Sequence, residues 1–276
     1  MTDDDLSIEE KRVFSSKAGK TEVFVAAGVG CVVVDVSGDR VGGFRVDHHC
    51  TARDVAGRDG RIVLATDEDV LLAPGYDALS FGPAVGVGLT SDAVVAVGED
   101  GHVGTLAFDA ALDGATSWRT VGSVDDPRAV DGRLVAAEDG VFRVSGRDLR
   151  HAGLDDVRDV AAAGPFAATG DGLFYLGNGW MEIEDGQWDL VDAAPDGRAH
   201  AVGAAGIRRR TEADGGEWLP VDRTESLATD ETPVEFAYGD DIVCAGTDGG
   251  TFLVDAGDGP RTQVLGLRDV GGVAIP

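Results

Sequence analysis

Cysteine, lysine and long apolar runs are all scarce in this 276-residue sequence. The three cysteines, Cys31, Cys50 and Cys244, form no CxxC pair and are too few and too scattered for a disulfide framework. No apolar run approaches the ~20 residues that span a membrane. The opening residues, MTDDDLSIEE, are acidic and lack the apolar core of a signal peptide. We therefore expect a cytoplasmic protein without membrane contact.

Positive charge is also in short supply. The 23 Lys and Arg residues stand against 50 Asp and Glu, which gives a net charge of −27, and three of the positive residues are lysines. Such a dense carboxylate surface is typical of a protein from a halophilic archaeon, because molar salt shortens the Debye length to ~3 Å and screens the self-repulsion. A nucleic-acid partner is excluded, since phosphate binding needs clustered Lys and Arg and almost none are clustered here.

Recognisable catalytic and metal-binding motifs are missing as well. There is no G-x-S-x-G elbow, and AGKT at 18–21 lacks the first glycine of a phosphate-binding loop, because Phe14 stands at that position. His48-His49-Cys50 places neighbouring side chains on opposite faces of a strand, so the three cannot bind one metal ion. We expect no metal site and no cofactor, and we favour a protein that is not an enzyme.

A repeated hairpin is the dominant feature that is present. The best copy, RLVAAEDGVFRV at 133–144, has two short apolar runs separated by an Asp-Gly turn signal. Tight hairpin turns need positive φ, which Asp and Gly tolerate, so each copy predicts two antiparallel strands. The runs are apolar on both faces, which is typical of a sheet packed between two others. The seven copies lie at 23–34, 61–72, 93–106, 133–144, 166–176, 200–209 and 242–254.

The spacing of these hairpins predicts a β-propeller. Corresponding turn glycines run from Gly30 to Gly249, and 249 − 30 = 219 residues over six intervals gives about 36 residues per repeat, close to the ~40 of a four-stranded blade. Trp118, Trp180 and Trp218 fall on the expected fourth strands, where blades splay and need bulk. The predicted fold is all-β, a single propeller of seven four-stranded blades, or six if the degenerate first or sixth copy folds differently.

The two ends of the chain should close the ring. A strand expected at 267–270 repeats the motif that opens each blade but has no hairpin after it. We expect it to join the blade begun by the N-terminus, whose own opening strand is expected at 12–14, because this pairing removes an open sheet edge. The expected organisation is a disordered acidic tail at 1–10 and a propeller domain at 11–276.

Arg-Asp pairs recur at the start of the predicted inner strands, near one mouth of the central channel. They could form a ring of alternating charge that holds a small ligand, an ion or the tail of a partner. The recurrence equally fits ion pairs that hold neighbouring blades in register, since such pairs follow a structural repeat. Both interpretations stay open. The candidate binding residues are Arg53, Asp54, Arg158, Asp159, Arg268 and Asp269.

The sixth copy breaks the apolar pattern with three consecutive arginines. Third strands elsewhere have sequences such as VFRV and LFYL, whereas Arg208, Arg209 and Arg210 cannot all be buried. They either contact an acidic partner or a phosphate group, or pair with local acids such as Glu212 and Asp214. They are the candidate partner contact of this sequence.

The hairpins resemble two groups of known propeller repeats. FAATGDGLFYL and LVAAEDGVFRV are similar to sortilin-like and BNR-type repeats, and TEADGGEW at 211–218 is the nearest approach to the BNR Asp-box, with Ala213 in place of the Asp. EEKRVFSSKAGKTEVFVAAGVG and TARDVAGRDGRIVLATDEDVLLA also resemble an uncharacterised haloarchaeal propeller family. The resemblance implies a fold and a host, and it implies no activity.

A propeller without catalytic motifs is best interpreted as a scaffold. We expect a monomeric, non-catalytic scaffold that presents its loops and channel mouth to protein partners. The alternative is an enzyme or small-ligand binder that uses the Arg-Asp ring. That alternative predicts several non-repeating polar residues converging at one mouth of the channel.

Overall fold

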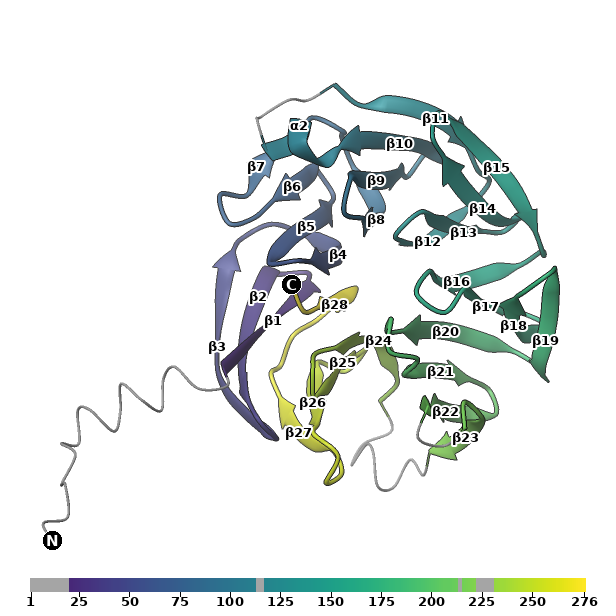
Figure 1. Cartoon of the computed structure of the whole chain (residues 1–276). Helices are drawn as coiled ribbons and strands as arrows, with labels where there is room; N and C mark the ends of the chain where they lie inside the picture. Colours follow the sequence, from purple (N-terminus) through teal and green to yellow (C-terminus); the bar gives the residue numbers. More distant parts are fainter. Residues whose placement is uncertain (1–19, 113–116, 213–214, 222–230) are drawn as a thin grey trace, which may run out of the picture.

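Seven four-stranded antiparallel sheets surround a central axis like the blades of a propeller in the computed structural model (Figure 1). The structure describes residues 20–112, 117–212, 215–221 and 231–276, and all seven sheets come from these residues. The seven-bladed fold expected from the hairpin repeats is confirmed. The expected tail at 1–10 and strand at 12–14 lie outside the described residues.

The blades follow one another along the chain, each running from the axis to the rim, and only the first draws a strand from the C-terminus. Blade 1 consists of β28 (Gly272–Ala274), β1 (Lys20–Ala27), β2 (Gly30–Ser37) and β3 (Arg40–His48). Blade 2 consists of β4 (Ala52–Arg58), β5 (Arg61–Thr66), β6 (Val70–Leu72) and β7 (Asp77–Ala78). Blade 3 consists of β8 (Ala84–Leu89), β9 (Ala93–Gly98), β10 (His102–Ala107) and β11 (Arg119–Ser123).

The remaining four blades repeat this order from inner to outer strand. Blade 4 consists of β12 (Pro127–Asp131), β13 (Leu134–Ala137), β14 (Gly140–Ser145) and β15 (Asp148–Gly153). Blade 5 consists of β16 (Val157–Ala161), β17 (Phe166–Thr169), β18 (Gly172–Leu176) and β19 (Trp180–Asp185). Blade 6 consists of β20 (Trp188–Ala193), β21 (Ala199–Gly203), β22 (Gly206–Arg210) and β23 (Trp218–Val221). Blade 7 consists of β24 (Pro233–Tyr238), β25 (Val243–Thr247), β26 (Thr251–Asp255) and β27 (Arg261–Val264).

The seven predicted hairpins form the two middle strands of the seven blades. In blade 4, Ala137 pairs with Gly140 across the two-residue turn Glu138-Asp139. Gly140 has φ +131°, and a Cβ there would lie 2.6 Å from the carbonyl oxygen of Leu154. Only glycine tolerates both the left-handed backbone and this close approach. The hairpin motif therefore requires its glycine at this position.

The two ends of the chain close the ring as expected, but through a different segment. β28 pairs antiparallel with β1, with Val273 opposite Val25. The strand expected at 267–270 is wrong, because this segment is a connection in which Asp269 has φ +52°. The carbonyl of Arg268 instead accepts a hydrogen bond of 2.9 Å from the backbone N–H of Gly28. The inner strand of blade 1 starts four residues after Arg268, at Gly272.

The hydrophobic core lies between adjacent blades. All six residues of β9 are buried. Val94 and Ala96 pack against blade 2, in one hydrophobic cluster. Val95 and Val97 point the other way and pack against blade 4. Burial of each valine contributes roughly 1.5 kcal/mol, which explains why the hairpin runs are apolar on both faces.

Large aromatic side chains fill the wider space near the rim. Trp118 directly precedes β11 and donates its indole N–H to the carbonyl of Leu79 in blade 2, at 2.8 Å. Trp180 on β19 donates to Ala152 of blade 4, at 2.9 Å. Trp218 on β23 packs edge-on against Phe166 of blade 5, with 5.3 Å between ring centroids. Each outer tryptophan thus contacts the preceding blade.

A short helix, α2 (Phe108–Leu112), follows β10, where the sequence predicts no helix. Phe108 and Ala111 are buried against the cluster between blades 2 and 3. Packing of these two apolar side chains, rather than helix periodicity, accounts for this single turn of helix.

Candidate functional site

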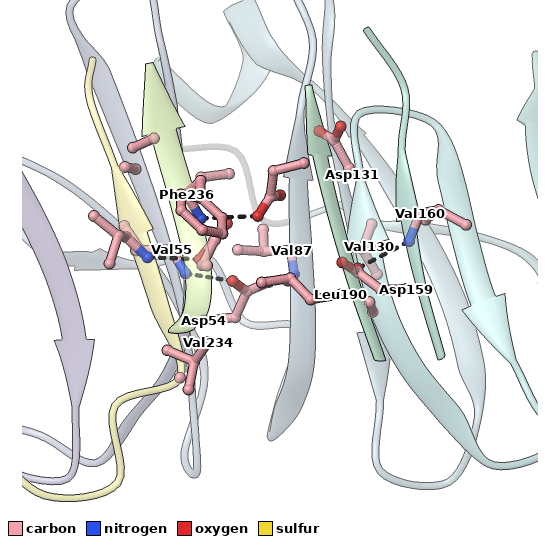
Figure 2. Close-up of a pocket in the computed structure, with 18 of the residues that line it drawn as sticks. Asp54, Val55, Val87, Val130, Asp131, Asp159, Val160, Leu190, Val234 and Phe236 are labelled. Atoms are coloured by element: carbon pink, nitrogen blue, oxygen red, sulfur yellow. Dashed lines mark hydrogen bonds between the residues drawn. The ribbon is translucent and has the colours of Figure 1, made fainter. Parts of the chain in front are cut away.

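The inner strands surround a central cavity of about 430 Å³. Its lining combines apolar and charged side chains, and six of the charged side chains are carboxylates, of which Figure 2 labels Asp54, Asp131 and Asp159. The six carboxylates are Asp54, Asp131, Asp159, Asp189, Asp192 and Glu235. This cavity is the channel to which the sequence assigns the Arg-Asp ring.

A β-bulge at one position of the inner strands explains how adjacent residues reach the same cavity. The pairing register shifts between Ala52 and Asp54 in β4, and at the corresponding point in five other inner strands. A bulge places two consecutive residues opposite one partner and turns both toward the same side. Arg53 and Asp54 can therefore both line the cavity, although neighbours on a regular strand point to opposite faces.

Asp54 and Asp159 join their blades to the next blade. Asp54 accepts hydrogen bonds from the backbone N–H of Val55, at 2.7 Å, and of Val87 in blade 3, at 2.8 Å. Asp159 accepts equivalent bonds from Val160, at 2.8 Å, and from Val191 in blade 6, at 2.7 Å. Each carboxylate satisfies two backbone donors, one on each side of a blade junction.

Three carboxylates that the sequence analysis missed each accept a backbone hydrogen bond across another junction. Asp131 of blade 4 accepts from Ala162 N–H at 2.7 Å, and Asp192 of blade 6 accepts from Phe236 N–H at 2.8 Å. Glu235 of blade 7 accepts from Val273 N–H of blade 1, at 2.5 Å. Asp131 and Asp192 lie two residues beyond the position of Asp54 in the repeat, on the same strand face.

Glycines occupy the carboxylate position at the other two junctions. A Cβ on Gly86 of blade 3 would lie 3.0 Å from Val130 Cγ2 of blade 4. A Cβ on Gly272 of blade 1 would lie 3.0 Å from the carboxylate of Asp54 in blade 2. At these two junctions the neighbouring blades are too close for a side chain. At the other five junctions a carboxylate bridges the two blades, so these carboxylates recur as part of the structural repeat.

The arginines at the bulge also bond to the next blade. Arg53 pairs with Glu99 of blade 3 at 2.5 Å, and Arg158 pairs with Asp189 of blade 6. Arg128, which the sequence analysis did not select, holds the same position in blade 4 and pairs with Asp156 at 2.5 Å, at the entry to blade 5. The geometry favours the blade-to-blade interpretation of the Arg-Asp pairs.

Arg268 and Asp269 do not belong to this ring. They lie in the connection before β28, and the residues of this region that line the cavity are Gly271, Val273, Ala274 and Ile275. The Arg-Asp sequence at 268–269 therefore does not occupy the position that Arg53-Asp54 occupies in blade 2. In blade 1, Gly272 stands at the position of Asp54.

Desolvation dominates the electrostatics of the cavity. It raises the pKa of Asp54 and of Asp159 to about 7, against the hydrogen bonds that lower them. The pKa of Asp192 and of Glu235 is raised well above the usual range by desolvation and then by repulsion from the neighbouring carboxylates, and desolvation also raises the pKa of Asp131. The cavity can take up protons near neutral pH.

The three arginines of the sixth copy lie in different environments and contact different residues. Arg208 donates two hydrogen bonds to Glu184 of blade 5, at 2.9 and 2.6 Å, and lies over the ring of Trp188. Arg210 donates to the carbonyl of Gly197 at 2.6 Å and pairs with Glu212 at 3.1 Å. Arg209 points to the other side of the strand and lines a second cavity. Asp214, the other acid considered from the sequence, lies outside the described residues.

The second cavity is a groove of about 550 Å³ between blades 6 and 7, which we call the blade 6–7 groove. Its apolar lining consists of buried side chains and of half-buried side chains nearer the opening. Blade 6 contributes Ile207 and Val221, and blade 7 contributes Phe236, Ile242, Val243 and Leu253. Its charged lining residues are Arg198, Arg209, Asp240, Asp241 and Asp255.

His200 forms part of the blade 6 wall as a neutral ring. It stacks on Phe236 with 4.4 Å between centroids, and its Nδ1 lies 3.0 Å from the hydroxyl of Tyr238. That hydroxyl donates to the carbonyl of Asp192 at 3.0 Å, so its oxygen accepts from Nδ1–H of the imidazole. Desolvation, followed by repulsion from Arg209 and Arg198, lowers the pKa of His200 to about 3. The ring therefore packs and positions rather than carrying charge.

Neither a metal-binding cluster nor a membrane-spanning helix occurs in the part of the chain that the structure describes. The described residues contain no group of three or more His, Cys, Asp or Glu side chains that could hold a metal ion. They also contain no helix long and apolar enough to cross a membrane. His48 stacks on Tyr76 at 4.4 Å, and Cys31, Cys50 and Cys244 are free thiols.

The fold and the bridged inner strands define this protein as a seven-bladed β-propeller with a central cavity and a blade 6–7 groove. The chain belongs to the HVO_0234-like beta-propeller family, whose sequence model matches residues 7–276. The family resemblance expected from the sequence is confirmed at this level. The likeness to sortilin-like and BNR-type repeats and the haloarchaeal host stay predictions.

Solved structures agree on the fold. YCF48 bound to a D1 peptide has a TM-score of 0.55 and 15% identity, covering 78% of this chain and 83% of that one. The designed protein Ika8 has a TM-score of 0.56 and 14% identity, covering 92% and 91%. AztD from Citrobacter koseri has a TM-score of 0.54 and 12% identity, covering 92% and 97%. No curated protein matches the chain.

Proposed function

We propose that this protein is a non-catalytic scaffold that docks a protein partner in the blade 6–7 groove. The observation that carries the proposal is the groove itself, about 550 Å³ in volume, with an apolar lining and a charged rim. Binding sites commonly have volumes of roughly 300–1,000 Å³ and this mixture of apolar walls and a few polar groups. YCF48, a propeller of the same fold, was solved with a peptide bound, which supports the proposal as a precedent.

The contacts of the charged groups in the central cavity also support a non-catalytic role. Its carboxylates bond to backbone N–H groups of the next blade, and Arg53 and Arg158 pair with acids of the next blade. Charged groups that recur with the blades and already have partners contribute to assembly of the ring. A catalytic site would instead bring unlike residues together at one place.

A second candidate function is binding of a small ligand, or catalysis, in the central cavity. The favouring observation is that the pKa of Asp54 and of Asp159 is raised to about 7, because such shifts are common at functional sites. A screen of small molecules for a rise in melting temperature tests it. A ligand that stabilises the wild type and not Asp159→Asn would favour this function over the scaffold.

The working environment forms part of the proposal. We place the protein in the cytoplasm of a salt-rich archaeal cell, acting as a monomer. The net charge of −27 and the three lysines support this placement, because the carboxylate surface suits high ionic strength.

The proposal is tested by affinity capture with the full-length chain from a lysate of the source organism, in molar KCl. The test variant is Val221→Asp, which puts a charge on a half-buried residue of the groove at the end of β23. The matched control is Val264→Asp on the outer strand of blade 7, where Val264 is 69% exposed. We expect a partner that the wild type and Val264→Asp retain and that Val221→Asp loses. Equal retention by all three proteins, or no specific partner for any, would overturn the proposal.

A further inference from the structure

The blade 6–7 groove has an apolar lining and an acidic edge on blade 7, and an occupant must match both. We propose that the occupant is a short peptide segment of the partner in which an apolar side chain lies next to Lys or Arg. This inference rests on the proposed function and specifies the partner's contact. The apolar side chain enters the lining, and the cationic group meets carboxylates of blade 7.

Three carboxylates gather at one end of the blade 7 wall. Asp240 and Asp241 precede β25, and Asp255 ends β26. Because Val243 is paired with Asp255 in the sheet, the turn before β25 and the end of β26 lie side by side. Asp240 and Asp241 are exposed, and neither forms an ion pair with another described residue. Their combined negative charge favours a cation at this end of the groove.

The basic groups of the opposite wall do not neutralise this cluster. Arg198 pairs with Asp196 at 2.7 Å, and Arg209 has a partner of its own. His200 is neutral because its pKa is about 3. The blade 7 carboxylates therefore keep a net negative charge, which favours binding of a positively charged group of the partner.

Arg198 also fixes the acidic turn in place. Its guanidinium crosses from blade 6 and donates to the carbonyl of Gly239 at 2.6 Å and to the carbonyl of Ile242 at 3.2 Å. These two carbonyls flank Asp240 and Asp241 in sequence. A turn held on both sides loses little freedom when a partner binds, which is the advantage of a preorganised site.

The apolar lining supplies the anchoring surface. Ile207 and Leu253 are 3% and 5% exposed, whereas Val221 and Val243 are half-buried nearer the opening. In molar salt, charge interactions beyond ~3 Å are screened, so only a cation in direct contact with a carboxylate contributes. Affinity then comes mainly from the apolar side chain, and the preference for Lys or Arg comes from the contact ion pairs.

The test is selection from a phage-displayed library of random dodecapeptides on the immobilised full-length protein. The proteins compared are the wild type, Val221→Asp, and the double variant Asp240→Asn/Asp241→Asn. The matched control is Asp67→Asn/Glu68→Gln, which neutralises an exposed acidic pair in the β5–β6 turn of blade 2. The best peptide is then synthesised and titrated by fluorescence anisotropy at 0.2 M and 2 M KCl.

We expect the wild type and the control to enrich peptides with an apolar residue beside Lys or Arg, and Val221→Asp to enrich none of them. The Asp240→Asn/Asp241→Asn variant should bind the selected peptide about 5- to 30-fold more weakly at 0.2 M KCl, and less so at 2 M. Groove-dependent peptides without positive charge would overturn this inference and leave the proposed docking intact. Peptides that bind Val221→Asp as well as the wild type, or no enrichment at all, would overturn both.

Discussion

Protonation of the carboxyl groups around the central cavity should make the propeller more stable as the pH falls from 7 to 5. The pKa of Asp54 and of Asp159 is raised to about 7 in the folded protein, against roughly 4 for Asp in an unfolded chain. Between these values the folded state holds protons that the unfolded state has released. The free energy of unfolding therefore falls as the pH rises, by up to ~1.4 kcal/mol per pH unit for each carboxyl.

Other carboxyls contribute with the opposite sign in a different pH range. Hydrogen bonds lower the pKa of Asp92, Asp156 and Asp196, of which Asp156 and Asp196 bond mainly to arginines. Their stabilising contribution is present above the unfolded pKa of about 4 and is lost as the pH falls through the lowered values. His200 also contributes in this range, because its pKa is about 3 in the folded protein and about 6.5 in an unfolded chain, so it lowers stability by up to ~1.4 kcal/mol per unit as the pH falls below about 6.5. The raised carboxyls of the cavity outnumber it, and the difference in slope between the wild type and a cavity variant isolates their contribution.

The variant Asp159→Asn separates the charge of this site from its hydrogen bonds. Asparagine keeps the shape but has one acceptor oxygen, so it satisfies one of the two N–H groups of Val160 and Val191 and loses roughly 1 kcal/mol. Because it cannot titrate, it should also make the pH slope less steep by up to ~1.4 kcal/mol per unit. The control, Asp148→Asn, changes an exposed carboxyl on β15 and should keep the wild-type slope.

Urea unfolding at fixed ionic strength, followed at pH 5, 6 and 7, measures these slopes. A wild-type stability that stays constant or rises from pH 5 to 7 would refute the assignment of raised pKa values to the cavity. An unchanged slope in Asp159→Asn would show that other groups carry the pH dependence.

Two further predictions concern packing between blades and are checked by urea midpoints. Gly88→Ala should destabilise the protein by about 1–3 kcal/mol, because the new Cβ would lie 2.5 Å from the backbone oxygen of Gly132, whereas Gly43→Ala meets no atom within 4 Å and should change stability by less than about 0.5 kcal/mol. Arg208→Ala should cost about 2 kcal/mol, because it leaves Glu184 without its two hydrogen bonds, whereas Arg150→Ala, at a side chain 69% exposed, should again cost less than about 0.5 kcal/mol. Equal effects within either pair would contradict the packing described here.

The hairpins were predictable because each carries its own signal. A turn glycine and two flanking apolar runs are local features, and their period gave the blade count without any knowledge of pairing across the ring. The closing strand lacks such a signal. Its three residues, Gly272–Ala274, contain no Arg-Asp motif. Because Arg268-Asp269 does match that motif, the closing strand was predicted at 267–270 instead.

The central cavity was predictable in part. Arg53, Asp54, Arg158 and Asp159 were found because the same two letters recur in β4 and β16. Asp131, Asp192 and Glu235 were missed, because none of them directly follows an Arg in its inner strand. In a chain with 50 acidic residues a single Asp carries little information, and the bulge that aligns these positions is visible only in the register of the strands.

The blade 6–7 groove was beyond the reach of the sequence. It depends on how two blades separate, and its lining comes from distant segments such as Ile207 and Leu253. The three arginines indicated an unusual strand, but strand alternation directs Arg209 alone into the groove. Arg208 pairs with Glu184 and Arg210 with Glu212, and the assignment of the three arginines as a partner contact stays a prediction.

Backbone hydrogen–deuterium exchange of the protein with and without its captured partner, in molar KCl, tests the central claim most directly. Docking in the blade 6–7 groove predicts slower exchange in β22, in β23 and in the turn between β24 and β25, with the inner strands unchanged. Slower exchange confined to the mouth of the central cavity, around Arg53 and Arg158, would contradict the groove and favour the channel as the binding site.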